Sequence, residues 1–276
     1  MKTTVEKILV IAAALLMCAG VSLAAELHPI VEVQSGYLFG ATSDGKWLKA
    51  DETARLLGDE TTYRVYGLTE ALGEAKGGKP TSPPEGNVCE ETWAVSLSPK
   101  PEEGVIAIAA PWDGLPRKPK ATDATQKIYV DAVRDFLKTK GIEQPKVKID
   151  DILRVDLDGD GEEEVLISAS NYFSKEGRVP MRSPAGSYSM VLLRRVVGGK
   201  VGTQLVAGEF HPKAYVSEEG SFDAPSIYKV IATLDLDGDG KLEVVVSSNY
   251  YEGEEITIYR SDPKKIEALL SVSCGA

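Results

Sequence analysis

The carboxy-terminal half of the chain shows the pattern of hydrophobic and polar positions that is typical of β-strands. From residue 147 onward, apolar runs alternate with Gly- and Asp-rich turns, and almost no helical period occurs. We expect eight strands here, enough for two units of four strands each. They are predicted at 149–157, 164–170, 188–197, 201–210, 228–236, 242–250, 255–260 and 266–272.

The amino-terminal half mixes helical and strand-like patterns. Apolar residues at helical spacing predict a helix over 123–140, which would cover a sheet. A shorter helix is expected over 51–57, and strands are expected at segments such as 61–66 and 88–97. The Gly- and Pro-rich segment 73–86 is expected to be a loop. The predicted fold class is therefore mainly β, and α+β overall.

These patterns divide the chain into three parts. Residues 1–24 are expected to be a signal peptide, and residues 25–145 an α+β region. Residues 146–276 are expected to hold two repeated units, at about 147–220 and 225–274.

The amino terminus has the layout of a secretory signal peptide. Lysines flank the start of an uninterrupted apolar run over 8–19, and small residues follow the run. Cleavage is expected after Ala24, with Ala25 as the alternative. The run is shorter than the ~20 residues that span a bilayer, so we expect no transmembrane span in the mature protein. Lipidation at Cys18 is a further alternative, although Met17 stands where a lipobox has a small residue. The protein is expected in the periplasm, at the cell surface or outside the cell.

The charge balance argues against two classes of partner. Asp and Glu number 42 against 31 Lys and Arg, which gives a formal charge of −11. Binding to nucleic acid or to an anionic membrane requires a basic face that neutralises phosphates. The two histidines, His28 and His211, leave little room for histidine-based metal catalysis.

Removal of the signal peptide would leave two cysteines, Cys89 and Cys274. In an oxidising compartment, an even pair favours one disulfide that closes a long loop. Two separate buried thiols are the alternative. The disulfide is favoured because a free thiol so close to the end of an exported chain would be exposed to oxidation.

The most informative feature of the chain is an acidic loop that occurs twice. The segments 155–167 and 234–246 share the sequence Asp-Leu-Asp-Gly-Asp-Gly, and each is bounded by apolar runs on both sides. Each unit therefore reads as strand, acidic loop, strand. Four carboxylates crowded into one loop would repel one another strongly without a cation.

The alternation within each loop predicts a set of oxygen ligands for Ca²⁺, which accepts six to eight oxygens in flexible geometry. Carboxylates are expected to bind from loop positions 1, 3, 5 and 9, and a backbone carbonyl from position 7. An EF-hand is excluded, because position 12 is Ile167 or Val246 and the flanks are β-rich. The predicted ligands are Asp156, Asp158, Asp160, the carbonyl of Glu162 and Glu164 in the first loop, and Asp235, Asp237, Asp239, the carbonyl of Lys241 and Glu243 in the second.

Both segments resemble the FG-GAP or VCBS repeats of integrin-α-type β-propellers. In that family an Asp-x-Asp-x-Asp-Gly-x-x-Asp loop joins two blade strands and binds calcium. The resemblance implies the same carboxylate ligands, except that Glu164 and Glu243 stand where the family has Asp. It covers roughly residues 147–276. Closed propellers typically have 4–8 blades, and only two units are found. We therefore expect two blade-like sheets completed or capped by the α+β region, and not a complete closed propeller.

Two functional hypotheses follow from these features. The first is an exported, calcium-binding, non-enzymatic module with about two structural Ca²⁺ ions, which would bind a protein or glycan partner or serve a structural role. The second is a secreted hydrolase with a calcium-stabilised, propeller-like domain. The sequence offers no clear set of convergent catalytic residues outside the loops, which favours the first hypothesis.

Overall fold

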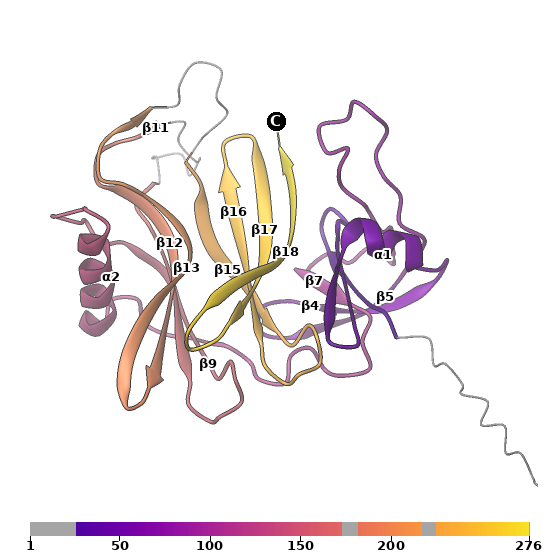
Figure 1. The fold of residues 1–276 in the computed structure, drawn as a ribbon, viewed down its shortest axis with the longest axis horizontal. Coiled ribbons are helices and arrows are strands. Elements are labelled where there is room, and N and C mark those ends of the chain that lie inside the picture. The colour runs from indigo at the N-terminus through magenta and orange to yellow at the C-terminus, as the bar shows by residue number, and fades with distance from the viewer. Residues whose placement is uncertain (1–25, 173–181, 217–224, 276) are drawn as a thin grey trace, which may run out of the picture.

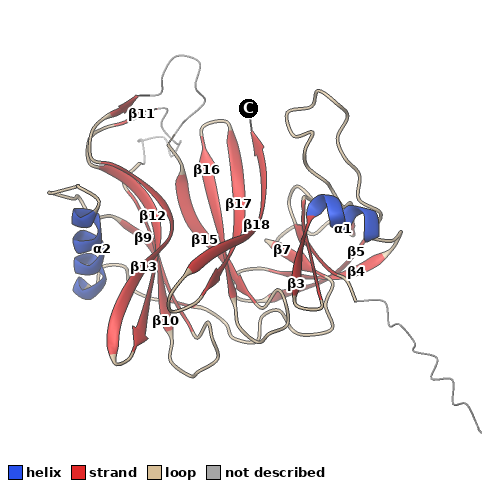
Figure 2. Ribbon diagram, in the orientation of Figure 1, coloured by secondary structure: helices blue, strands red, loops and turns tan. Residues whose placement is uncertain are grey.

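The computed structural model describes residues 26–172, 182–216 and 225–275 (Figure 1). The predicted signal peptide, with Cys18 and both expected cleavage positions, lies outside the described residues. Strands form most of the regular structure, as Figure 2 shows, and two helices accompany them in the described part. The prediction of a mainly β fold is confirmed.

The amino-terminal region forms an open antiparallel sheet. Strand β7 pairs with β1 on one side and with β4 on the other, so the central strand of the sheet comes later in the sequence than both of its neighbours. Helix α1 (Ala50–Leu56) follows β3 directly. In the order β3-β2-β1-β7-β4-β5-β6, the strands are Lys46–Lys49, Leu38–Ser43, His28–Glu32, Ile106–Ile108, Thr61–Tyr66, Ala71–Gly77 and Leu97–Ser98.

Two predictions for this region are wrong in part. The loop expected over 73–86 begins later, because β5 continues to Gly77. Gly77 packs so tightly that a Cβ there would lie 2.6 Å from the ring of Tyr63. The strand expected over 88–97 is reduced to the short β6 and isolated bridges at Ala94. In both places tertiary packing overrides the local pattern.

The second sheet is built from the first predicted repeat and one short strand before it. Helix α2 (Lys127–Thr139) covers one face of this sheet, with Tyr129, Val133 and Leu137 buried. The helix begins later than predicted, because Asp123 accepts hydrogen bonds from Thr125 in a separate turn. In the order β13-β12-β10-β9-β8, the strands are Lys200–His211, Ser187–Val197, Glu164–Ser170, Ile149–Val155 and Lys120–Ala121, and a separate pair joins β11 (Arg182–Ser183) to β14 (Tyr215–Val216).

The third sheet is an antiparallel meander built from the second predicted repeat. Its strands are β15 (Ile227–Leu234), β16 (Glu243–Tyr250), β17 (Gly253–Ser261) and β18 (Ile266–Gly275). All eight strands predicted after residue 147 are therefore present, with ends that differ by up to three residues. The buried valines and isoleucines of the two repeats explain this agreement, since the pattern that predicts the strands also fills the core.

The third sheet packs between the other two (Figure 1). One apolar cluster joins Ile30, Phe39 and Ile106 of the first sheet to Leu234 and Ile258 of the third. A second cluster joins the β9–β13 sheet to the other side of β15 and β16. The amino-terminal region therefore shares its core with the second repeat.

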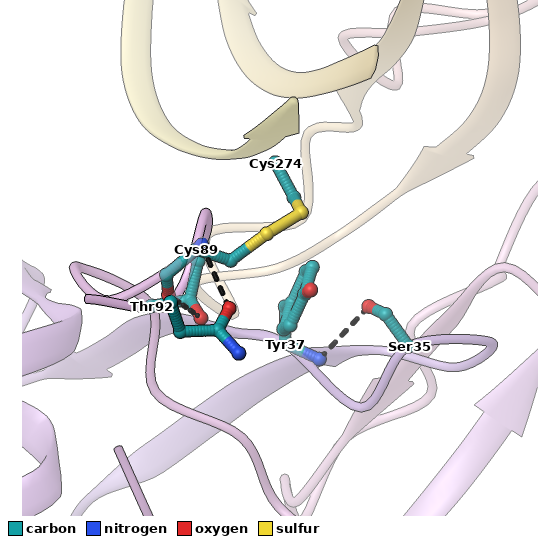
Figure 3. The surroundings of a disulfide bond; sticks show 6 residues. Ser35, Tyr37, Cys89, Thr92 and Cys274 are labelled. Carbon is teal, nitrogen blue, oxygen red and sulfur yellow. Dashed lines mark hydrogen bonds between the residues drawn. A yellow bond between two sulfur atoms is a disulfide. The ribbon is translucent and has the colours of Figure 1, made fainter. Parts of the chain in front are cut away.

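The disulfide predicted between Cys89 and Cys274 is present (Figure 3). It joins the segment after β5 to the last strand, with 5.2 Å between the two Cα atoms and a separation of 185 positions in sequence. Cys89 is held locally, because Thr92 Oγ1 donates to its carbonyl and its own amide donates to Asn87 Oδ1. The disulfide thus fastens the amino-terminal region to β18.

Candidate functional site: two acidic loops

The two acidic loops occupy equivalent places in their sheets. Loop 1 (156–163) joins β9 to β10, and loop 2 (235–242) joins β15 to β16. Each connects the first two long strands of an antiparallel four-stranded arrangement, and Figure 1 shows both at the same edge of the molecule. The loops also contact each other, since the amide of Leu242 donates to the carbonyl of Leu157 at 2.7 Å.

Loop 1 is folded by hydrogen bonds from its own backbone amides to its carboxylates. Asp156 accepts two of these bonds, one on each oxygen, and the chain wraps around its side chain. Glu164 reaches back from the start of β10 to the second loop position. The bonds, donor first, are Gly159 N to Asp156 Oδ1 (2.7 Å), Gly161 N to Asp156 Oδ2 (3.1 Å), Asp160 N to Asp158 Oδ1 (3.3 Å), Glu162 N to Asp160 Oδ1 (2.8 Å) and Leu157 N to Glu164 Oε2 (2.8 Å).

Loop 2 repeats the same five bonds at the corresponding positions. The agreement extends to the individual oxygen atoms, although the two loops lie in different sheets. They are Gly238 N to Asp235 Oδ1 (2.7 Å), Gly240 N to Asp235 Oδ2 (3.1 Å), Asp239 N to Asp237 Oδ1 (3.2 Å), Lys241 N to Asp239 Oδ1 (2.8 Å) and Leu236 N to Glu243 Oε2 (3.0 Å).

The glycines make this wrapping possible. Gly159, Gly161, Gly238 and Gly240 have φ values of 79°, 93°, 78° and 82°, in the left-handed region that other residues rarely adopt. Repeated left-handed glycines turn successive amides toward the first carboxylate of each loop. The Asp-Gly-Asp-Gly spacing noted in the sequence is therefore a requirement of the backbone path.

The carboxylates converge in each loop, but the converging sets differ. In loop 1, oxygens of Asp156, Asp158 and Glu164 lie within 4.8 Å of one another. In loop 2 the corresponding set is Asp235, Asp237 and Asp239. Of the predicted carboxylate ligands, Asp160 and Glu243 thus lie outside the tightest cluster of their loop. Glu162 and Lys241 occupy the predicted seventh position, where each amide donates to the preceding aspartate.

Two arginines at equivalent register positions accompany the loops, and sequence reasoning missed both. Arg260 pairs with Asp237, and its Nε lies 3.7 Å from Glu243 Oε1. Arg194 of β12 pairs with Val165, and Tyr259 of β17 pairs with Val244. Arg195 and Arg260 are the next residues along these two strands. The Arg195 guanidinium instead donates to Ser261 Oγ at 2.9 Å. The signal available in the sequence was an arginine at the same register position in both repeats, close to the valine that follows each loop.

Burial disfavours the ionised form of several of these carboxylates and so raises their pKa. It raises the pKa of Glu243 to about 8, and the negative charge of Asp237 adds to the shift. Burial also raises the pKa of Asp235 and Asp237 in loop 2, and of Glu164 in loop 1. A cation at either loop would favour the ionised forms, so the arrangement is suited to holding positive charge.

A segment of the amino-terminal half, the strap 112–117, contacts both loops. Trp112 Nε1 donates to the carbonyl of Asp235 at 2.9 Å, and the amide of Asp235 donates to the carbonyl of Gly114 at 2.8 Å. Arg117 donates from Nε to the carbonyl of Asp156 at 2.6 Å and from Nη2 to the carbonyl of Gly240 at 2.7 Å. One guanidinium therefore bridges the two loops.

In the described ranges 26–172, 182–216 and 225–275, groups of three or more acidic, histidine or cysteine side chains spaced to hold a metal ion occur at these two loops alone. Neither helix of that part of the chain is long and apolar enough to cross a membrane.

Comparison of the chain with protein-family models, with curated proteins and with solved structures gave no significant match. The resemblance to FG-GAP or VCBS repeats therefore stays a prediction from the sequence.

Proposed function

We propose that each acidic loop binds one Ca²⁺ ion and that the ions stabilise the fold of a non-enzymatic binding or structural module. The observation that carries the proposal is the duplication of the loop down to individual atoms. Five amide-to-carboxylate bonds recur on the same oxygens in two sheets whose other features differ. A solvated turn has no need to bring three carboxylates together, as both loops do, whereas a cation site does.

The donor set fits Ca²⁺. All side-chain donors are carboxylate oxygens, the hard ligands that this ion prefers. An ionised carboxylate can accept about four hydrogen bonds, and Asp156, the most engaged carboxylate of loop 1, accepts two from amides. Oxygen lone pairs therefore remain for an ion. When bound, the ion would neutralise the converging carboxylates and fix the turn between two strands.

The two loops are expected to differ in affinity. In loop 2, Arg260 already pairs with Asp237, so an ion there competes with a guanidinium. Among the predicted ligands of loop 1, Asp156 has a cationic neighbour at 4.0 Å, from its Oδ2 to Arg117 Nε, and this arginine is held by carbonyl groups. Arg154 and Lys120 pair with Glu163, which is not a predicted ligand. We therefore expect loop 1 to bind Ca²⁺ more tightly.

The blade-like interpretation and the export of the protein belong to the same proposal. The order β9-β10-β12-β13 and the meander β15–β18 each have the acidic loop between the first two strands, which is where the resembling repeats carry their calcium loop. A disulfide is typical of oxidising compartments, which supports a location outside the cytoplasm.

Terbium luminescence tests the proposal one loop at a time, because Tb³⁺ replaces Ca²⁺ and is sensitised by nearby indoles. Trp112 packs against Gly238 of loop 2, and the ring of Trp47 lies 5.8 Å from the Arg260 guanidinium. Indole-sensitised emission should therefore report on loop 2, and Ca²⁺ should displace it. Asp237→Asn should abolish the emission, whereas the matched variant Asp158→Asn in loop 1 should retain it. Emission that is absent, or unchanged in Asp237→Asn, would contradict the proposal.

A further inference from the structure

A cavity lies where the amino-terminal region meets the strands of the carboxy-terminal half. Its volume is about 610 Å³, within the range of pockets that hold small organic ligands. One wall comes from β2, β3, α1 and the segment after β5, and the other from β13, β15, β17 and β18. Two of the residues that line it, Phe39 and Leu270, are buried apolar side chains. The cavity is distinct from both acidic loops.

The rim of this cavity carries more negative than positive charge. Asp51, Glu91 and Glu255 line it, against one cation, Lys49. Within the described part of the chain, Glu91 and Glu255 form no ion pair, and Asp51 pairs only with the exposed Arg55, at 3.4 Å. Two carboxylates are therefore left without a positive partner at the mouth of a large cavity.

Aromatic side chains line the same cavity. Trp93 comes from the amino-terminal wall, and Tyr228 and Tyr259 from the opposite one. Ser248 pairs with Tyr228 on one side and with Glu255 on the other, so the three residues form one row across the third sheet. Tyr259 lies on the same strand as Glu255. Carboxylates beside aromatic rings attract cations, both by charge and through the electron-rich faces of the rings.

The disulfide fixes the two walls relative to each other. Cys89 lies two residues before Glu91 and four before Trp93, and Cys274 lies on β18, whose residues 268–271 line the opposite wall. Covalent closure of a cleft reduces the ordering that a ligand would otherwise have to impose, which favours binding. The disulfide thus holds the two walls of the cavity together covalently, in addition to the packing of the core.

From these features we propose that the cavity binds an organic cation, an ammonium or guanidinium group attached to an apolar or aromatic portion. The charged group would lie beside Glu255 and Glu91, and the apolar portion against Trp93 and Tyr259. This adds a ligand class to the binding role proposed above, and it does not require calcium in the loops. A neutral saccharide, the other common occupant of aromatic clefts, would leave the two carboxylates unpaired.

The probe is an acetylated Tyr-Arg dipeptide amide, which carries one positive charge. The matched neutral probe has citrulline in place of arginine, and a neutral chitotriose tests the saccharide alternative. Each is titrated into ¹⁵N-labelled oxidised protein, with the amide resonances of Trp93, Glu255 and Ser271 as reporters. We expect shifts at these positions with the arginine peptide, at least about tenfold weaker binding of the citrulline peptide, and weakening by salt.

Two variants locate the site. Glu255→Gln should weaken the arginine peptide about tenfold, whereas Glu102→Gln, an exposed change outside the cavity, should leave its affinity unchanged. Equal binding of the two peptides, binding of chitotriose alone, or no shifts at millimolar peptide would each overturn the proposal. The titrations are run with calcium and with chelator, so that loss of loop occupancy is distinguished from failure of the cavity to bind.

Discussion

The Arg117 guanidinium contacts both acidic loops, and its removal should destabilise the protein measurably. The perturbation is Arg117→Met, which keeps much of the apolar stem but removes the charge and all the donors. It abolishes bonds to the carbonyls of Asp156, Leu157 and Gly240, at 2.6, 3.3 and 2.7 Å.

The magnitude follows from the kind of bond that is lost. Hydrogen bonds from a charged donor contribute about 1.5–3 kcal/mol each, and the sum is not additive when three share one guanidinium. The Arg117 side chain is 25% exposed, so water can rehydrate part of what is lost. The 3.3 Å bond is also the weakest of the three. We therefore expect a decrease of about 2–4 kcal/mol in the free energy of unfolding.

Urea unfolding followed by circular dichroism, in the presence of chelator, measures this decrease. The control is Lys118→Met, which makes the same change of charge at the exposed neighbouring position and should cost less than about 0.5 kcal/mol. Arg117→Lys should recover only part of the loss. A lysine ammonium is a compact charge without the planar fork of donors by which the guanidinium bonds to both loops. Equal stability of Arg117→Met and Lys118→Met would refute the bridging role.

The remaining predictions concern the disulfide, a buried carboxylate and a tightly packed glycine. Cys89→Ser should lower the free energy of unfolding by up to about 5 kcal/mol relative to the oxidised wild type, in the chain-entropy description of a loop closed by cysteines 185 positions apart; urea unfolding measures this, and the reduced wild type should match the variant. The raised pKa of Glu243 means that the folded state holds its proton more tightly than the unfolded chain does. Without calcium, stability should therefore fall as pH rises from about 4.5 to about 8, and Glu243→Gln should flatten this dependence in thermal melts. Gly238→Ala should lower the melting temperature more than Gly240→Ala, since both have positive φ but only the first brings a Cβ against Trp112, at 3.0 Å. Equal melting temperatures would contradict that packing.

The strands of the carboxy-terminal half were predictable because the sequence repeats and each strand buries the residues that mark it. Val244, Val245 and Val246 follow loop 2 and are all buried, as an apolar run that is covered on both faces requires. The disulfide was also accessible from the sequence, since only two cysteines remain after the expected cleavage. Both inferences depend on local spacing or on counting, and neither needs knowledge of distant contacts.

The features that sequence reasoning missed all depend on contacts between distant parts of the chain. Arg117 lies 123 residues before Gly240, the carbonyl of which it contacts. Arg260 meets Asp237 only because β17 pairs with β16. The cavity likewise forms between walls that are far apart in sequence. The strap 112–117, which carries Arg117, has no periodicity that would show which surface it crosses. Its contacts therefore become visible only in the folded structure.

Calorimetric titration of the mature, oxidised protein with Ca²⁺ decides whether the acidic loops are calcium sites. We expect binding to two sites with a rise in melting temperature, the tighter site lost in Asp158→Asn and the weaker one in Asp237→Asn. At a free concentration 100 times the dissociation constant, each occupied site should add about 2.7 kcal/mol to the free energy of unfolding. Absence of binding heat together with an unchanged melting temperature at millimolar calcium would show that the loops are not calcium sites.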